Sequence, residues 1–118
     1  IIGSGDTFLV DCFLDSWEIH GFANKFTEPM KSHMLEWSKR LKNKQPVLDY
    51  VPVDIWHLWH GSLKNRLYMD RHEVILKYDY DPVRDIVLEN DVYEWASDKP
   101  EMHEDIAQYF HKRKEDDL

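Results

Sequence analysis

The sequence has little cysteine and no long apolar run, and each shortage excludes a class of protein. Among 118 residues there is one cysteine, Cys12, so both an intrachain disulfide and a cysteine-rich zinc site are excluded. No stretch approaches the roughly 20 apolar residues that a membrane helix needs, and no charged segment followed by an apolar one marks a signal peptide. We therefore predict a protein without a membrane span in a reducing compartment, the cytoplasm.

A basic excess is also lacking, because 23 acidic residues outnumber 15 Lys and Arg and give a formal charge of −8. Duplex nucleic acid is normally bound by a basic face that neutralises phosphates. We expect no duplex nucleic acid partner, although an acidic chain can still bind anions through a metal ion.

Length and composition predict one unit with its own core. A chain of 118 residues with 42% hydrophobic residues falls within the usual size of one domain. The chain opens with Ile1-Ile2-Gly3 and no methionine, so we interpret residues 1–118 as a single domain or a fragment of a longer protein. The charged tail 112–118 is expected to fray.

Helical patterns occupy the first third of the chain. Residues 7–14 read as a short buried helix, with Asp6 at its N-terminus, where a carboxylate is stabilised by unpaired backbone amides. Thr27 can cap a second helix that runs to about Lys44 and is stopped by Pro46. Its apolar stripe consists of Phe26, Met30, Met34, Trp37 and Leu41.

The pattern then changes to period two, which predicts a strand over 47–59, with Pro52 placing it at a sheet edge or near the strand start. We predict a third helix over 62–77, short extended pieces over 85–95, and a last helix that begins near Pro100. The expected fold class is α+β, with three to four helices packed on a small sheet.

The segment Trp56-His57-Leu58-Trp59-His60-Gly61 is the most site-like stretch of the sequence. It combines two indoles with two imidazoles, and imidazole is the commonest metal ligand. His57 and His60 are three apart, so in an extended strand they face opposite ways and share a metal only if the chain turns. We therefore expect one of the two, and not both, to be a metal ligand, against the alternative of a structural histidine bonded to backbone.

A basic stretch follows this segment and contains Lys64, Arg66, Tyr68 and Arg71. One interpretation is a solvated helix face paired with nearby acids, where each exposed pair contributes about 0–1 kcal/mol. The other is a clamp for the phosphates of a nucleotide, because guanidinium groups bind phosphate in bidentate geometry.

Three motifs resemble the C-terminal half of metal-dependent nucleotide-sugar glycosyltransferases of the GT-A fold. Gly3-Ser4-Gly5-Asp6 opens a helix, His57-Leu58-Trp59-His60-Gly61 precedes the basic stretch, and Tyr80-Asp81-Pro82 forms a turn, as in phage and bacterial proteins of this type. The resemblance covers roughly residues 1–86 and implies the acceptor-side half of a GT-A-like α/β domain.

The resemblance also implies roles. Asp6 would bind the acceptor hydroxyl or act as its general base, and His57, with His60 as second choice, would bind Mn²⁺ or Mg²⁺. Lys64, Arg66, Tyr68 and Arg71 would hold the nucleotide-sugar donor, while the acceptor stays unnamed. The family's Asp-x-Asp metal motif would belong to a missing N-terminal half, so this fragment alone is expected to be inactive.

Two alternatives come from other classes. A small metal-dependent nuclease would use His57, His60, Asn65 and His72, whose residue types resemble a His-Asn-His site. A non-enzymatic α+β interaction module would present exposed aromatic side chains to a partner. The candidates for that surface are Trp17, Trp56 and Trp95.

Overall fold

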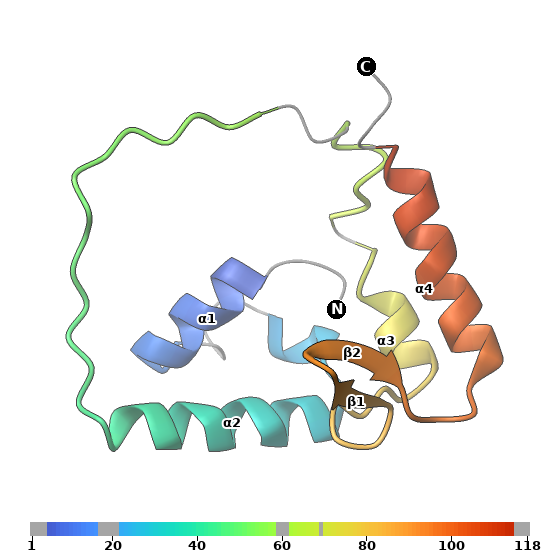
Figure 1. The fold of residues 1–118 in the computed structure, drawn as a ribbon, viewed down its shortest axis with the longest axis horizontal. Coiled ribbons are helices and arrows are strands. Elements are labelled where there is room, and N and C mark those ends of the chain that lie inside the picture. Colours follow the sequence, from blue (N-terminus) through green and yellow to red (C-terminus); the bar gives the residue numbers. More distant parts are fainter. Residues whose placement is uncertain (1–4, 17–21, 59–61, 69, 115–118) are drawn as a thin grey trace.

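The computed structural model describes residues 5–16, 22–58, 62–68 and 70–114. In these ranges the chain forms four α-helices, one 3-10 helix and one two-stranded antiparallel sheet, which confirms the α+β class. The elements in order are α1 (Gly5–Leu14), η1 (Phe22–Lys25), α2 (Glu28–Lys42), α3 (Glu73–Lys77), β1 (Ile86–Glu89), β2 (Val92–Trp95) and α4 (Pro100–Arg113) (Figure 1). No described helix combines the length and the apolar character that crossing a bilayer requires.

The two helices predicted from the first third of the chain are confirmed as α1 and α2. Thr27 caps α2, since its hydroxyl oxygen accepts from the Met30 amide at 3.4 Å. The helices are joined by Ser38, whose hydroxyl donates to the Cys12 carbonyl at 2.7 Å. The α1–α2 pair is therefore held by a buried hydrogen bond as well as by the edge-to-face contact of Phe13 with Trp37.

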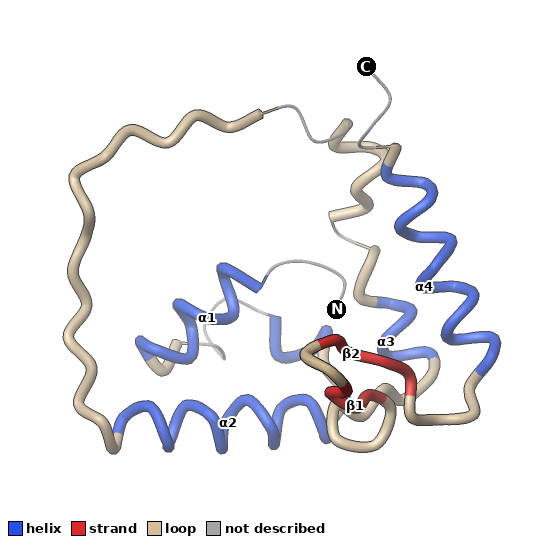
Figure 2. The backbone as a smooth tube through the Cα atoms, in the orientation of Figure 1, coloured by secondary structure: helices blue, strands red, loops and turns tan. Residues whose placement is uncertain are grey.

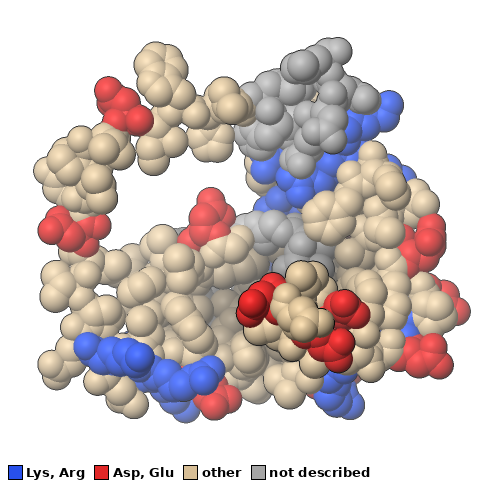
Figure 3. All heavy atoms as spheres, viewed as in Figure 1, with Lys and Arg blue, Asp and Glu red and all other residues tan. Residues whose placement is uncertain are grey.

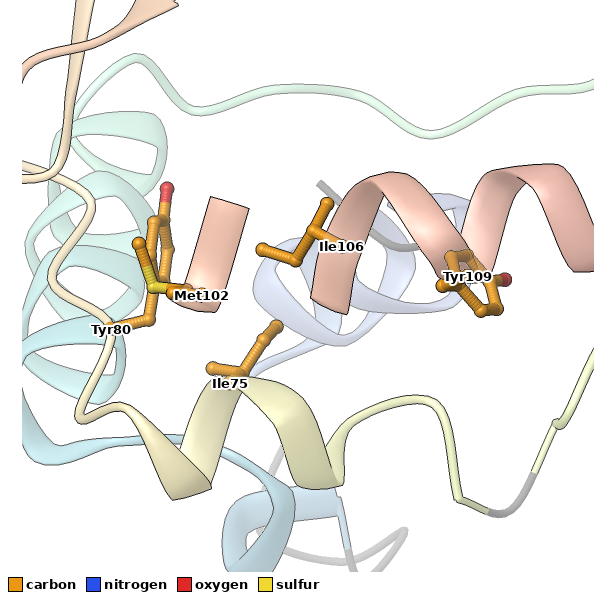
Figure 4. Packing of buried hydrophobic residues seen from close by; sticks show 5 residues of the cluster. All are labelled: Ile75, Tyr80, Met102, Ile106 and Tyr109. Atoms are coloured by element: carbon orange, nitrogen blue, oxygen red, sulfur yellow. The ribbon is translucent and has the colours of Figure 1, made fainter. Parts of the chain in front are cut away.

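The main core lies between α3, the turn that follows it, and α4. Its buried members are Ile75, Tyr80, Met102, Ile106 and Tyr109. In Figure 4, Ile75 points from α3 toward Ile106, and Met102 lies beside the ring of Tyr80. The predicted helix at Pro100 is thus confirmed, and its apolar stripe forms one wall of this core.

A buried ion pair joins the ends of several elements. The Lys99 ammonium donates to Asp85 Oδ2 at 2.8 Å and to the Tyr78 and Asp79 carbonyls at 3.1 and 3.2 Å. Burial by itself would raise the pKa of Asp85, but hydrogen bonds from Lys99 and from the Asp81 amide lower this pKa overall. The carboxylate stays ionised and fixes β1 against the chain entering α4.

The expected extended pieces over 85–95 are a hairpin. Ile86 pairs with Trp95 and Glu89 with Val92, and Asn90 and Asp91 connect them with φ of 48° and 64°. Two left-handed residues are typical of a type I′ turn, and Asn and Asp tolerate that region better than most residues.

The predicted helix over 62–77 is wrong for most of its length. Residues 63–68 form turns, and the helix is limited to Glu73–Lys77. Leu67 has a φ of 46°, a left-handed conformation that cannot continue a right-handed helix. Periodicity alone did not reveal this break, since leucine is a good helix former.

The predicted strand is extended over 46–58 but pairs with no other described segment, because the described ladder joins only β1 and β2 (Figure 2). Trp59 lies outside the described residues. At the other end of the chain, α4 continues through Lys112 and Arg113, which had been assigned to the tail, and 115–118 are outside the described residues.

Candidate functional site

Two arginines of the basic stretch meet at one tyrosine. The guanidinium carbons of Arg66 and Arg71 each lie 4.7 Å from the ring centroid of Tyr68. Arg71 is buried, Arg66 is half-buried and Tyr68 is partly exposed. A cation near an aromatic face gains about 0.5–2 kcal/mol, so the ring helps to keep two like charges close together.

Local turns position this cluster. The Asn65 amide donates to Ser62 Oγ at 3.2 Å, and the Arg66 amide donates to the Ser62 carbonyl at 3.1 Å. After the left-handed Leu67, the Arg71 amide donates to the Leu67 carbonyl at 2.8 Å. The predicted meeting of these side chains is therefore produced by two successive turns and not by a helix face.

A hollow of about 450 Å³ opens beside Arg71, between α3 and α4. Its cations are Arg71, Lys77 and Lys112, and its carboxylates are Asp70, Glu73 and Asp105. Lys77 and Asp105 already bind each other at 2.8 Å. Because the three cations and three carboxylates balance, the hollow by itself favours no anion. Arg66, which is not part of its lining, adds a further cation beside Tyr68.

The other predicted site residues are spread over the molecule. Asp6 is exposed in the first turn of α1, and Lys64 is exposed in the turns before Tyr68. His57 is exposed near the end of the extended segment, and His60 lies outside the described residues. In Figure 1 the first turn of α1, which holds Asp6, and the end of the extended segment 46–58, which holds His57, lie apart.

The described residues hold no ready metal site, since no three His, Cys, Asp or Glu side chains converge in those ranges. His57 would thus contribute one ligand of a set whose other members come from elsewhere. A single imidazole binds a divalent ion weakly, because stable sites use several ligands.

His72 lies in the interior, packed against aromatic rings, and not at a candidate site. It is buried against Phe8 and Phe26, with ring centroids 5.8 and 6.2 Å away, and neither ring nitrogen has a hydrogen-bond partner within the described part of the chain. Burial, with the nearby charges of Arg71 and Lys25, lowers its pKa to about 4. It therefore offers no support for the nuclease alternative.

Sequence reasoning missed an apolar groove of about 640 Å³ between the hairpin and α4. Trp95 and His103 form part of its wall and stack with ring centroids 4.3 Å apart and planes 14° apart. Phe110 and Tyr93 extend the aromatic lining. The number of aromatic residues over 93–110 was the available signal, but only the hairpin brings them to one side.

Comparisons with protein-family models, with curated proteins and with solved structures gave no match.

Proposed function

We propose that this chain is the acceptor-side half of a metal-dependent glycosyltransferase of the GT-A type, acting on a nucleotide-sugar donor. The observation that carries the proposal is the pair of guanidinium groups gathered at Tyr68. Two like charges held at one ring gain most from an anion that binds both, and a diphosphate has the charge and the spacing to do so.

The motif resemblance supplies the remaining roles. Asp6 would accept the proton of the acceptor hydroxyl, and His57, or His60 in its place, would bind Mn²⁺ or Mg²⁺, which neutralises the diphosphate leaving group. Lys64 would add a third cation on the donor side. Since Asp6 and His57 lie apart in the described chain, the proposal requires the donor-binding N-terminal half to bring these elements together.

A first prediction tests the diphosphate clamp. Replacing Arg66 with Gln should weaken binding of inorganic diphosphate about tenfold, because one charge-assisted hydrogen bond contributes about 1.5–3 kcal/mol. Isothermal titration at low salt in metal-free buffer measures the change. Arg40→Gln is the matched control, since Arg40 is an exposed arginine on α2, and its effect should be small. Equal losses in both variants would contradict the clamp.

A second prediction tests His57 as a metal ligand. Substoichiometric Mn²⁺ should broaden the imidazole NMR signals of His57 before those of His33 and His111, which are also exposed. In His57→Ala, the residual broadening should spread evenly over the exposed histidines. Equal broadening of all exposed histidines in the unmodified chain would remove His57 from the proposal, while leaving the diphosphate clamp to its own test.

A second candidate function, a non-enzymatic interaction module, is favoured by one observation. Trp56 is 88% exposed within the extended segment 46–58. An indole as open as this is typical of a surface that another polypeptide covers. Trp95 is partly exposed at the apolar groove, and Trp17 lies outside the described residues. Binding of diphosphate at Arg66 and Tyr68 would favour the enzyme over this candidate.

A further inference from the structure

The segment 46–58 exposes more apolar surface than a folded chain normally leaves in water. Val47, Ile55 and Leu58 are each at least 82% exposed, and so is Trp56. Figure 3 shows open space between this segment and the body of the molecule. Large exposed apolar patches mark surfaces that bind another molecule.

The backbone of residues 46–56 is also extended and is not part of the described ladder. Among residues 46–56 the Val53 amide donates to the Val51 carbonyl and the Tyr50 amide to Asp49 Oδ1, both at 2.8 Å. Apolar side chains alternate onto both faces, as in a strand that is covered on both sides. An extended edge of this kind is a template for strand addition.

The sequence of the segment is complementary to its own reverse. Counting outward from Val53 in both directions, aromatic meets aromatic, aliphatic meets aliphatic, and acid meets imidazole. Next to the axis Pro52 faces Asp54, a pair without such a match. The matched facing pairs are Val51 with Ile55, Tyr50 with Trp56, Asp49 with His57, and Leu48 with Leu58.

We propose that this chain forms a twofold dimer in which residues 48–58 of one copy pair antiparallel with residues 48–58 of a second copy, with Val53 on the axis. Such an interface is isologous, because the same residues serve both copies. The proposal goes beyond the glycosyltransferase function and does not depend on it.

Pro52 determines which amides of the segment can point toward the second strand. If Val53 faces its symmetry mate in a hydrogen-bonded pair, the odd-numbered amides point toward the second strand and position 52 points away from it. Proline, which has no N–H, then removes no ladder bond. The short Val53–Val51 turn opens on pairing, and the Val53 amide exchanges that bond for one to the second copy.

The same alternation of hydrogen-bonded and non-hydrogen-bonded pairs favours the contact between Tyr50 and Trp56. Tyr50 and Trp56 fall in a non-hydrogen-bonded pair, where opposed Cα atoms are closest, about 4.5 Å apart. Aromatic pairs across strands contribute about 0.2–1 kcal/mol. Both copies provide this pair, so it is made twice.

Neighbouring registers are less favourable. Centring the pairing on Asp54 places two Asp54 carboxylates opposite each other, and like charges directly opposed are destabilising. Centring it on Pro52 opposes two prolines and leaves Asp49 facing Ile55. The register on Val53 avoids both and sets each Asp49 against His57, a charge-complementary pair when the imidazole is protonated.

The dimer should be weak. An eleven-residue strand pair covers less than the roughly 1,200–2,000 Å² of a standard interface, and a two-stranded ribbon is marginal by itself. We expect a dissociation constant in roughly the micromolar range.

A third prediction tests the register by cross-linking. With Cys12→Ser as background, Val53→Cys should give a covalent dimer under mild oxidation, since facing Cα atoms about 5.5 Å apart lie within disulfide range. Val51→Cys is the matched control, because position 51 faces Ile55 and lies roughly 13 Å from its own mate, at ~3.3 Å per residue. Equal cross-linking of the two variants would overturn the register.

Sedimentation equilibrium completes the test with paired prolines. Val53→Pro removes an inward amide and should leave a monomer, whereas Asp54→Pro removes an outward amide and should leave the dimer. A monomeric parent chain at millimolar concentration, open-ended aggregates, or dissociation by Asp54→Pro but not by Val53→Pro would each overturn the proposal.

Discussion

Lowering the pH from 6.5 to 4 should reduce the free energy of unfolding by about 3 kcal/mol through His72 alone. The folded-state pKa of His72 falls from 6.5 to about 4, mainly because the ring is buried, with Arg71 and Lys25 adding repulsion. Between pH 6.5 and 4 the imidazole of His72 is mostly protonated in the unfolded chain and mostly neutral in the folded chain. At ~1.4 kcal/mol per pH unit, stability is lost as pH falls through this window.

Urea titrations at intervals between pH 7 and 4 measure this loss. His72→Phe keeps an aromatic ring beside Phe8 and Phe26 but cannot bind a proton, so most of the slope should disappear. His33→Phe, at an exposed position on α2, should keep it. An undiminished slope in His72→Phe would show that another group is responsible.

The carboxylates act in a different window. The pKa values of Asp81 and Asp85 are lowered below 3.8, by backbone and side-chain hydrogen bonds that outweigh burial at Asp85. Their stabilising contribution is present above that pH and is lost only as pH falls further. Stability should thus be lost over two separate pH ranges as the pH falls, first through His72 and then through the carboxylates.

Replacing Met102 with alanine should lower the free energy of unfolding by roughly 3 kcal/mol. Met102 is fully buried between α3, Tyr80 and the rest of α4, and large-to-small changes in a core cost about 2–5 kcal/mol through lost burial and the cavity left behind. Thermal or urea unfolding followed by circular dichroism measures the change.

Two variants on α4 act as controls. Met102→Leu conserves most of the volume and should cost less than about 1.5 kcal/mol. Phe110→Ala removes more atoms, but Phe110 is 46% exposed, so it should cost less than Met102→Ala. If Phe110→Ala proved the more damaging, the core would have to lie on the other side of α4.

The parts of the fold that were predictable have local causes. Thr27 binds the Met30 amide within one turn, and Pro100 begins α4 because a missing N–H is harmless in the first turn. The prediction of a helix over 62–77 was wrong because Leu67 has a positive φ, which the residue type leucine does not indicate. The prediction of a strand over 47–59 was right about the extended backbone over 46–58 but not about pairing. Pairing depends on a second segment, which the local pattern does not reveal.

The candidate site was predictable only in part. Arg66, Tyr68 and Arg71 lie within six residues, so their meeting depends on local turns. His72 could not be recognised as buried, because Phe8 and Phe26 are distant in sequence and only the tertiary fold places them against it. The aromatic groove had the same difficulty, since Trp95 and His103 come from different elements.

The ammonium group of Lys99 also has a consequence for partial unfolding of the chain. It binds the turn after α3 and the first residue of the hairpin region from a position next to α4. Detaching any one of these elements leaves the buried Asp85 carboxylate without its counterion, which is costly in an interior. Subglobal openings should therefore involve α3, the hairpin and α4 together as one cooperative unit, to which the buried hydrogen bond from the Thr27 hydroxyl to the Tyr80 carbonyl also couples the start of α2.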